Sequence, residues 1–199
     1  MKITNLKYGK RGKIIIYADG NYLSSLPAEI LLNSGLNVGS YIDEDIINGL
    51  LEEVNKSKAK EKAFRLLSHR AHSKSELCSK IQRTFGKESA EITASKMEDL
   101  GLIDDEKFAF DYANELFRRK FYAVSRIKYE LGQKGINREI IDKIFDENDF
   151  DETENLSKLI EKKYPNGFNS EKEYRRSVAY LQRLGYSYFQ IKSEINYAD

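Results

Sequence analysis

Residues 124–145 read VSRIKYELGQKGINREIIDKIF, and this stretch decides the fold that we predict. Apolar residues recur every three or four positions on both sides of Gly135, which is the spacing of one face of an α-helix. Glycine commonly ends a helix, and the side chain of Asn137 is of the kind that caps the start of one. The stretch therefore predicts two short helices. Leu131 lies on the first of them, and we expect its side chain to be buried between the helices of this repeat. The apolar positions are Val124, Ile127, Leu131, Ile140, Ile141, Ile144 and Phe145.

The same pattern returns along the chain at a spacing of 50 residues. Leu131 has counterparts in Ile81 and Leu181, and Gly135-Ile136-Asn137 matches Gly185-Tyr186-Ser187. A repeat of this length means that each group of helices buries its apolar face against its neighbour. We therefore expect a mainly α fold, with three tandem three-helix repeats in an elongated, curved stack. Such a stack binds another macromolecule along its length.

A second alignment lays residues 67–81 on residues 181–195, and both alignments pair a helix, a short turn and another helix. Polar side chains that can cap a helix mark further starts, and two of them have the Ser-x-x-Glu spacing of a capping box. From residue 57 these signals predict about nine short helices in three groups of three. The predicted starts are Ser73-x-x-Glu76, Asp104-Asp105, Ser170-x-x-Glu173 and Ser187.

Residues 1–26 have a different pattern. Ile14 to Tyr17 form a β-branched and aromatic run, and Asp19-Gly20 separates it from Tyr22-Leu23. Asp-Gly between two such runs is a strong hairpin signal, because glycine supplies the positive φ of a tight turn. Ile3 to Tyr8 can add a third strand, so we expect a small N-terminal antiparallel sheet. Pro27 can then open a short helix that ends near Gly35.

Helical periodicity begins at Asp43, where either one long helix or two helices broken near Asn55 fit the pattern. These signals divide the chain into four parts. We expect the hairpin and short helix in residues 1–42, and the long helix with the first repeat in 43–103. The second and third repeats would occupy 104–148 and 149–199.

The net charge of +1 conceals large blocks of one sign. Residues 56–74 and 118–134 are basic, whereas residues 41–53 and 145–161 are acidic. Such blocks indicate either a surface with basic and acidic faces or ordinary solvated helix faces. Basic stretches with aromatic residues between them suit phosphate backbones or an acidic protein groove. The expected arginine, asparagine and glutamine set for reading base edges is missing, so we do not expect sequence-specific binding.

The sequence contains few candidates for catalytic or metal-binding residues. Cys78 is the only cysteine, which excludes an internal disulfide and favours a reducing cytoplasm. His69 and His72 lack a third metal ligand, and Asp104-Asp105 is better explained by helix capping than by a metal pair. The N-terminus lacks the apolar core of a signal peptide, and no apolar run is long enough to span a membrane. We therefore expect no enzyme activity, cofactor, metal or membrane partner.

Four motifs stand out: Leu66-Leu67-x-x-Arg70-x-x-Ser73-x-x-Glu76-Leu77, Leu100-x-Leu102-Ile103-Asp104-Asp105-x-x-Phe108-Ala109, Ile127-x3-Leu131-x-x-Lys134-Gly135-Ile136, and the closing Leu181-x-x-Leu184-Gly185-Tyr186-Ser187-x3-Ile191. Taken together, they resemble the RecX family of recombination regulators over roughly residues 57–197. Leu184 departs from the family pattern, which usually has arginine there. The acidic start of the third repeat, Asp151-Glu152-Thr153-Glu154, is a second departure.

The resemblance implies a monomeric regulatory protein of DNA repair, homologous recombination and the SOS response. It implies binding to the RecA filament on single-stranded DNA, with suppression of the RecA ATPase and strand exchange. Two alternatives stay open: a general single-stranded DNA-binding protein, and an interaction adaptor unrelated to recombination. From charge and position we expect these solvated residues to contact RecA or DNA: Arg70, Lys74, Arg118, Arg119, Arg126 and Lys134.

Overall fold

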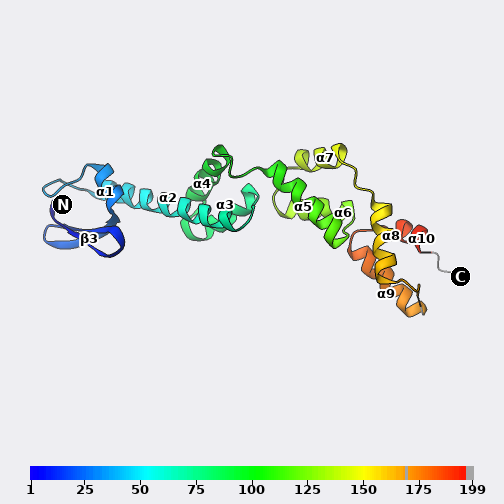
Figure 1. The fold of residues 1–199 in the computed structure, drawn as a ribbon. Helices are drawn as coiled ribbons and strands as arrows, with labels where there is room; N and C mark the ends of the chain where they lie inside the picture. Colours follow the sequence, from blue (N-terminus) through cyan, green and yellow to red (C-terminus); the bar gives the residue numbers. More distant parts are fainter. Residues whose placement is uncertain (169, 196–199) are drawn as a thin grey trace. The chain divides into compact units, whose positions relative to one another are not determined.

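The computed structural model describes residues 1–168 and 170–195. In these residues the chain forms ten α-helices and a three-stranded sheet, which confirms the mainly helical fold (Figure 1). The chain divides into two compact units. The first unit contains Met1–Arg70 and Leu77–Met97, and the second contains Ala71–Glu76 and the chain from Glu98 onward.

The first unit begins with the predicted antiparallel sheet. Its strands are β1 (Ile3–Tyr8), β2 (Lys13–Ala18) and β3 (Asn21–Pro27), in the order β1-β2-β3. The Asp19-Gly20 turn has the predicted left-handed backbone, with φ of 48° and 83°. Ile14, Ile16 and Leu26 lie on one face of the sheet and are buried with residues of the next helices.

Two helices cover this apolar face. Helix α1 (Ala28–Ser34) ends at Gly35, as predicted. Helix α2 (Glu44–His69) is continuous, so the alternative of a break near Asn55 is wrong. Asn55 is followed by residues of good helix propensity, and Val54 and Ala59 are both buried on the same helix. The stripe of apolar residues therefore continues across it without a break.

Helices α3 (Lys74–Phe85) and α4 (Lys87–Asp99) complete the first group of three helices. Lys62 of α2 donates hydrogen bonds to the carbonyl of Lys80 at 2.8 Å and to the hydroxyl of Thr84 at 2.7 Å. Its ammonium thereby stabilises the C-terminal end of α3, where helix carbonyls lack partners. One cation of the basic stretch 56–74 thus supports the fold.

The second unit contains the next six helices. Helices α5 (Asp105–Lys120), α6 (Val124–Gln133) and α7 (Arg138–Glu147) share one core, in which Leu131 is fully buried as predicted. Helices α8 (Glu152–Lys163), α9 (Glu171–Arg183) and α10 (Tyr188–Glu194) surround a separate core. The predicted caps at Asp104, Asn137, Ser170 and Ser187 all accept hydrogen bonds from the first turn of their helices.

Within the second unit, a similar joint between helices occurs twice. Ser73 donates its hydroxyl proton to the carbonyl of Lys134 at 2.6 Å, and Ser125 donates to the carbonyl of Gly185 at 2.8 Å. In both joints a serine near the start of one helix donates a hydrogen bond to the turn that follows another helix. Ser73 also accepts from the N–H of Glu76 at 3.0 Å, as the capping signal predicts.

A carboxylate completes each joint. Asp105 accepts a hydrogen bond from the N–H of Lys74 at 2.8 Å, and Glu152 accepts one from the N–H of Val124 at 2.5 Å. The two donors are the first residues of α3 and α6, and they are 50 positions apart. The capping prediction holds for Asp104, whereas the carboxylate of Asp105 caps the start of another helix, α3. Burial raises the pKa of Asp105.

The close approach of backbones at these joints requires glycine. Gly185 has a φ of +102°, and a Cβ atom there would lie 2.7 Å from Arg126 Cβ and 3.1 Å from Arg126 N. Gly167 has a φ of +73°, but a Cβ atom there would meet no atom of the described residues within 4 Å. A comparison of the two glycines therefore separates the effect of backbone strain from that of a steric clash of the added Cβ atom.

We expect Gly185→Ala to lower the free energy of unfolding by about 2–4 kcal/mol, combining positive-φ strain with overpacking. Gly167→Ala, which adds only the strain, should cost about 1 kcal/mol. Urea denaturation followed by circular dichroism compares the two variants. Equal losses would mean that the joint between Gly185 and Arg126 can open without cost.

Candidate functional site

The six predicted contact residues differ in their surroundings. Arg70 follows the last residue of α2 in the first unit and is exposed. The other five lie in the second unit. Lys74 forms an ion pair with Glu98 at 2.6 Å, and this hydrogen bond raises the pKa of Lys74. Its ammonium is therefore partly neutralised.

Lys134 is also engaged within the fold. Its Nζ lies 3.4 Å from Glu76 Oε1 and 5.6 Å from the centre of the Tyr112 ring. Only 27% of the Lys134 side chain is exposed, and the Glu76 side chain is 15% exposed. The pair belongs to the joint that contains Ser73, so Lys134 is engaged within the second unit and is not a free surface charge.

Arg126 was expected to be solvated, and the structure corrects this. Its guanidinium lies 5.9 Å from the centre of the Tyr122 ring and 5.2 Å from that of Tyr129, and it pairs with Glu130 at 2.6 Å. The Nε atom is buried and has no hydrogen-bond partner within the described residues. The correction has a simple reason: Tyr129 on α6 and Tyr122 just before this helix bracket the side chain, and Gly185 packs on its Cβ.

We expect Arg126→Ala to destabilise the protein by about 1–2 kcal/mol, because it removes two cation–π contacts and an ion pair. Arg119→Ala is the matched control. It removes an exposed arginine, so a change within about 0.5 kcal/mol is expected. Thermal denaturation of both variants measures the difference. If Arg126→Ala has the same melting temperature as the parent protein, the contacts of Arg126 with the two tyrosine rings contribute nothing to stability.

Arg118 and Arg119 are the predicted residues that remain available. Both are exposed on the last turn of α5, and among the described residues neither forms an ion pair with a carboxylate. Lys120 follows them and is exposed as well. Cations here interact favourably with the negative end of the helix dipole, which explains their position but leaves their hydrogen-bonding groups open.

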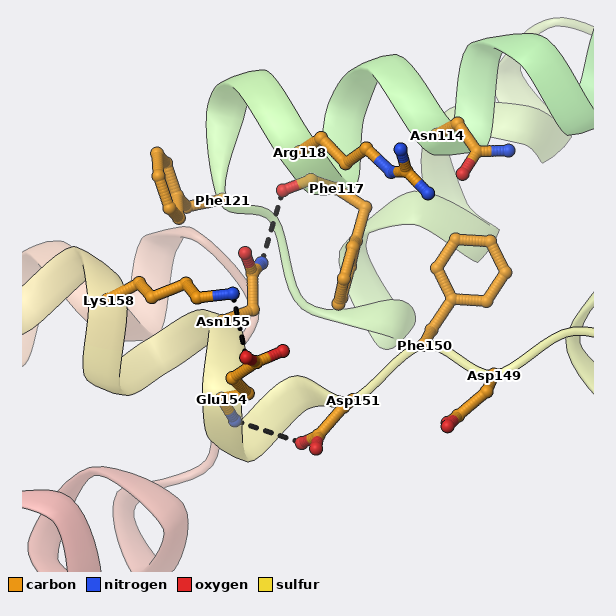
Figure 2. A pocket seen from close by; sticks show the side chains of 10 residues that line it. All are labelled: Asn114, Phe117, Arg118, Phe121, Asp149, Phe150, Asp151, Glu154, Asn155 and Lys158. Atoms are coloured by element: carbon orange, nitrogen blue, oxygen red, sulfur yellow. Dashed lines mark hydrogen bonds and ion pairs between the residues drawn. The ribbon is translucent and has the colours of Figure 1, made fainter.

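A cavity of about 540 Å³ adjoins these arginines (Figure 2). Arg118 lies along its rim on α5, and Lys158 reaches toward it from α8. Phe117 and Phe150 meet edge to face on its wall, with ring centres 5.1 Å apart. The lining residues are Asn114, Phe117, Arg118, Phe121, Asp149, Phe150, Asp151, Glu154, Asn155 and Lys158.

Asn155 holds the floor of this cavity in place. Its side-chain amide donates to the carbonyl of Phe117 at 3.1 Å and to the hydroxyl of Tyr186 at 3.2 Å. Burial raises the pKa of Tyr186 to about 12, so the phenol stays protonated. The sequence did not predict this cavity. Its one visible signal was the acidic run at residues 151–154, which departs from the RecX family pattern.

The cavity has the character of a binding surface. It combines aromatic walls with arginine, lysine, asparagine and carboxylate groups, which can contact a mixed polar and apolar partner. Among the described residues no group of three His, Cys, Asp or Glu side chains is placed to hold a metal ion. Each helix in the described parts of the chain is too short or too polar to cross a membrane.

The chain is similar to known proteins over most of its length. The family model "RecX, second three-helix domain" matches residues 104–143, which contain α5, α6 and part of α7. A "Regulatory protein RecX" from Chlorobium phaeobacteroides is 31% identical over 149 residues, covering 73% of this chain and 97% of the relative. Another from Caldanaerobacter subterraneus is 28% identical over 200 residues, covering 98% of this chain and 99% of the relative.

Two crystal structures have the same fold. "Crystal structure of regulatory protein RecX" is 23% identical, with a TM-score of 0.67 over 97% of this chain and 98% of the other. The structure of RecX from Lactobacillus salivarius has a TM-score of 0.57 at 22% identity, over 71% of this chain and 94% of the other. The fold thus defines a protein built from three-helix repeats. The chain belongs to the RecX family.

Proposed function

We propose that this protein binds the RecA filament on single-stranded DNA and lowers its ATPase and strand-exchange activities. The observation that carries the proposal is membership of the RecX family of regulatory proteins. The exposed pair Arg118 and Arg119, next to an aromatic and polar cavity, supports the proposal physically. The filament offers both phosphates and acidic side chains, and the planar guanidinium donates two parallel hydrogen bonds to either group.

The decisive experiment measures RecA ATPase on single-stranded DNA with increasing amounts of this protein. We expect the rate to fall and to saturate, because a bound regulator occupies a finite number of filament sites. Strand exchange should be inhibited over the same range of concentrations. An unchanged or increased ATPase rate would contradict inhibition.

Direct binding to single-stranded DNA is a second candidate function, favoured by the three consecutive exposed cations at 118–120. Salt separates the two candidates. Binding to phosphates alone falls steeply with salt, because it is driven by counterion release. Binding to the RecA filament should retain a salt-resistant component from apolar contacts such as those of Phe117 and Phe150.

A further inference from the structure

The N-terminal sheet carries the densest cluster of unpaired cations that we find in the described chain. The first 27 residues contain five Lys or Arg and one Asp. Four of these cations lie at the adjoining ends of β1 and β2 and in the loop between them, and all four are exposed. No ion pair within the described residues involves them. They are Lys7, Lys10, Arg11 and Lys13.

This pattern contrasts with three of the six cations that we expected to contact RecA or DNA. Lys74, Arg126 and Lys134 each lie within 3.4 Å of a carboxylate oxygen. An ion pair weakens the attraction of a cation for an external phosphate, because the carboxylate must be displaced or must share its partner. The sheet therefore offers a polyanion a set of charges that the protein itself leaves free.

The sheet also has one face that the helices do not cover. Ile14 and Ile16 belong to the face packed against α1 and α2. Side chains alternate along a strand, so Ile15 and Tyr17 lie on the opposite face. The strand register places Lys7 beside Ile15, and Tyr22 beside Tyr17, on that outer face.

Aromatic rings and a lysine are already in contact on this outer face. The rings of Tyr17 and Tyr22 meet edge to face with their centres 6.4 Å apart, and Lys7 Nζ lies 5.2 Å from the centre of the Tyr17 ring. Tyr17 is half-buried and held by these neighbours, whereas Tyr22 is 63% exposed. The half-buried Tyr17 ring beside the exposed Tyr22 ring, with Lys7 over Tyr17, provides a platform for a planar ligand.

We propose that the outer face of the N-terminal sheet is a binding site for single-stranded DNA. An unpaired base stacks on Tyr22, and Lys7, Lys10, Arg11 and Lys13 contact the phosphates of the strand as it continues from Tyr22 toward the loop between β1 and β2. Aromatic stacking is tolerant of base identity because every base has a π-face, and the cations follow the backbone. Paired bases in a duplex cannot reach a ring on a flat sheet, so the chemistry selects single strands.

This inference rests on the second candidate function, direct binding to single-stranded DNA, and deepens it by placing the binding site on the N-terminal sheet. The test is a fluorescence anisotropy titration of a labelled oligothymidylate of about 20 nucleotides, long enough to exceed the usual site size of one binding face. The full-length protein is used without RecA, and a duplex of equal length is titrated in parallel. We expect the duplex to bind more weakly than the single strand.

The charge variant is Lys7→Gln with Lys10→Gln and Lys13→Gln. We expect at least a tenfold loss of affinity at about 0.1 M salt and a decrease of about 2 in the slope of log affinity against log salt, since each single-strand phosphate contact contributes about 0.7. The matched control is Lys96→Gln with Lys107→Gln and Lys172→Gln. It removes three exposed lysines from helices and changes the net charge equally.

The aromatic variants test stacking separately from charge. Tyr22→Ala should weaken oligothymidylate binding about tenfold with the salt slope unchanged, and Tyr22→Phe should restore binding because it keeps the ring. Tyr188→Ala is the control, since that ring is 54% exposed on α10. Circular dichroism of each variant establishes that the fold is retained.

Three outcomes would overturn the inference. The sheet lysine variant could weaken binding no more than its control, or Tyr22→Ala could bind as the parent does. In the third outcome, the sheet variants bind DNA normally but no longer inhibit RecA ATPase. The outer face of the sheet would then bind an acidic protein surface and not DNA. The last result would leave the proposed function standing. Failure of ATPase inhibition by the parent protein would leave DNA binding by the sheet unaffected.

Discussion

Replacing Leu131 by alanine is expected to lower the free energy of unfolding by about 2–5 kcal/mol. Leu131 is fully buried on α6, in the core shared with Ile127, Leu116 and Ile141. Alanine removes three methyl or methine carbons from a site that neighbouring helices surround, and the repeats leave little freedom for the core to collapse around the cavity. The loss arises from lost transfer free energy and from the cavity together.

Chemical denaturation measures this loss, with the tertiary transition followed by circular dichroism. Leu102→Ala is the control, because Leu102 is 46% exposed in the segment before α5. We expect it to cost less than about 1 kcal/mol, since little apolar area is removed from contact. An unchanged melting temperature for Leu131→Ala would show that the buried face of α6 contributes nothing to stability.

The double replacement Arg118→Glu and Arg119→Glu is expected to weaken inhibition of RecA ATPase at least tenfold. The change reverses two exposed charges without breaking an ion pair among the described residues. Truncating or reversing charges in a desolvated interface costs several kcal/mol, and each 1.4 kcal/mol is a factor of ten in affinity. Arg126 stays unchanged, because its contacts with Tyr122 and Tyr129 would mix folding with binding.

The readout is the protein concentration that halves the RecA ATPase rate on single-stranded DNA. Lys96→Glu with Lys107→Glu reverses two other exposed cations and should inhibit as the parent does. Helical circular dichroism should be nearly unchanged in both variants, because exposed charges contribute little to folding. If the arginine variant folds and inhibits like the parent, the binding surface lies elsewhere on the molecule.

Local patterns predicted most of the helices and the sheet correctly. Apolar spacing of three or four residues marked the buried faces of α3, α6 and α9, where Leu77, Leu131 and Leu181 are fully buried. The Asp19-Gly20 turn and the caps at Asn137 and Ser187 depend on residues within a few positions of one another. The break near Asn55 was undecidable, because asparagine tolerates both a helix interior and a cap.

The candidate site was predicted less well. Charge and position selected six cations, but they did not distinguish exposed Arg118 and Arg119 from Lys74 and Lys134, which form ion pairs. Only the pair of Arg126 with Glu130, four residues apart on one helix, had a local signal. The cations of β1 and β2 were visible in the sequence, yet their common face required the strand register.

Sequence periodicity alone determined the helices, the hairpin and the 50-residue repeat, because these depend on apolar spacing and turn chemistry within short segments. Tertiary structure decided which charges stay free. Glu76 and Lys134 are 58 residues apart, and Asp105 caps a helix that begins 31 residues earlier. Such contacts follow from the packing of segments within the second unit, and a one-residue change in that packing would pair different side chains. The face that can bind a partner is therefore a property of the assembled repeats and of the sheet register.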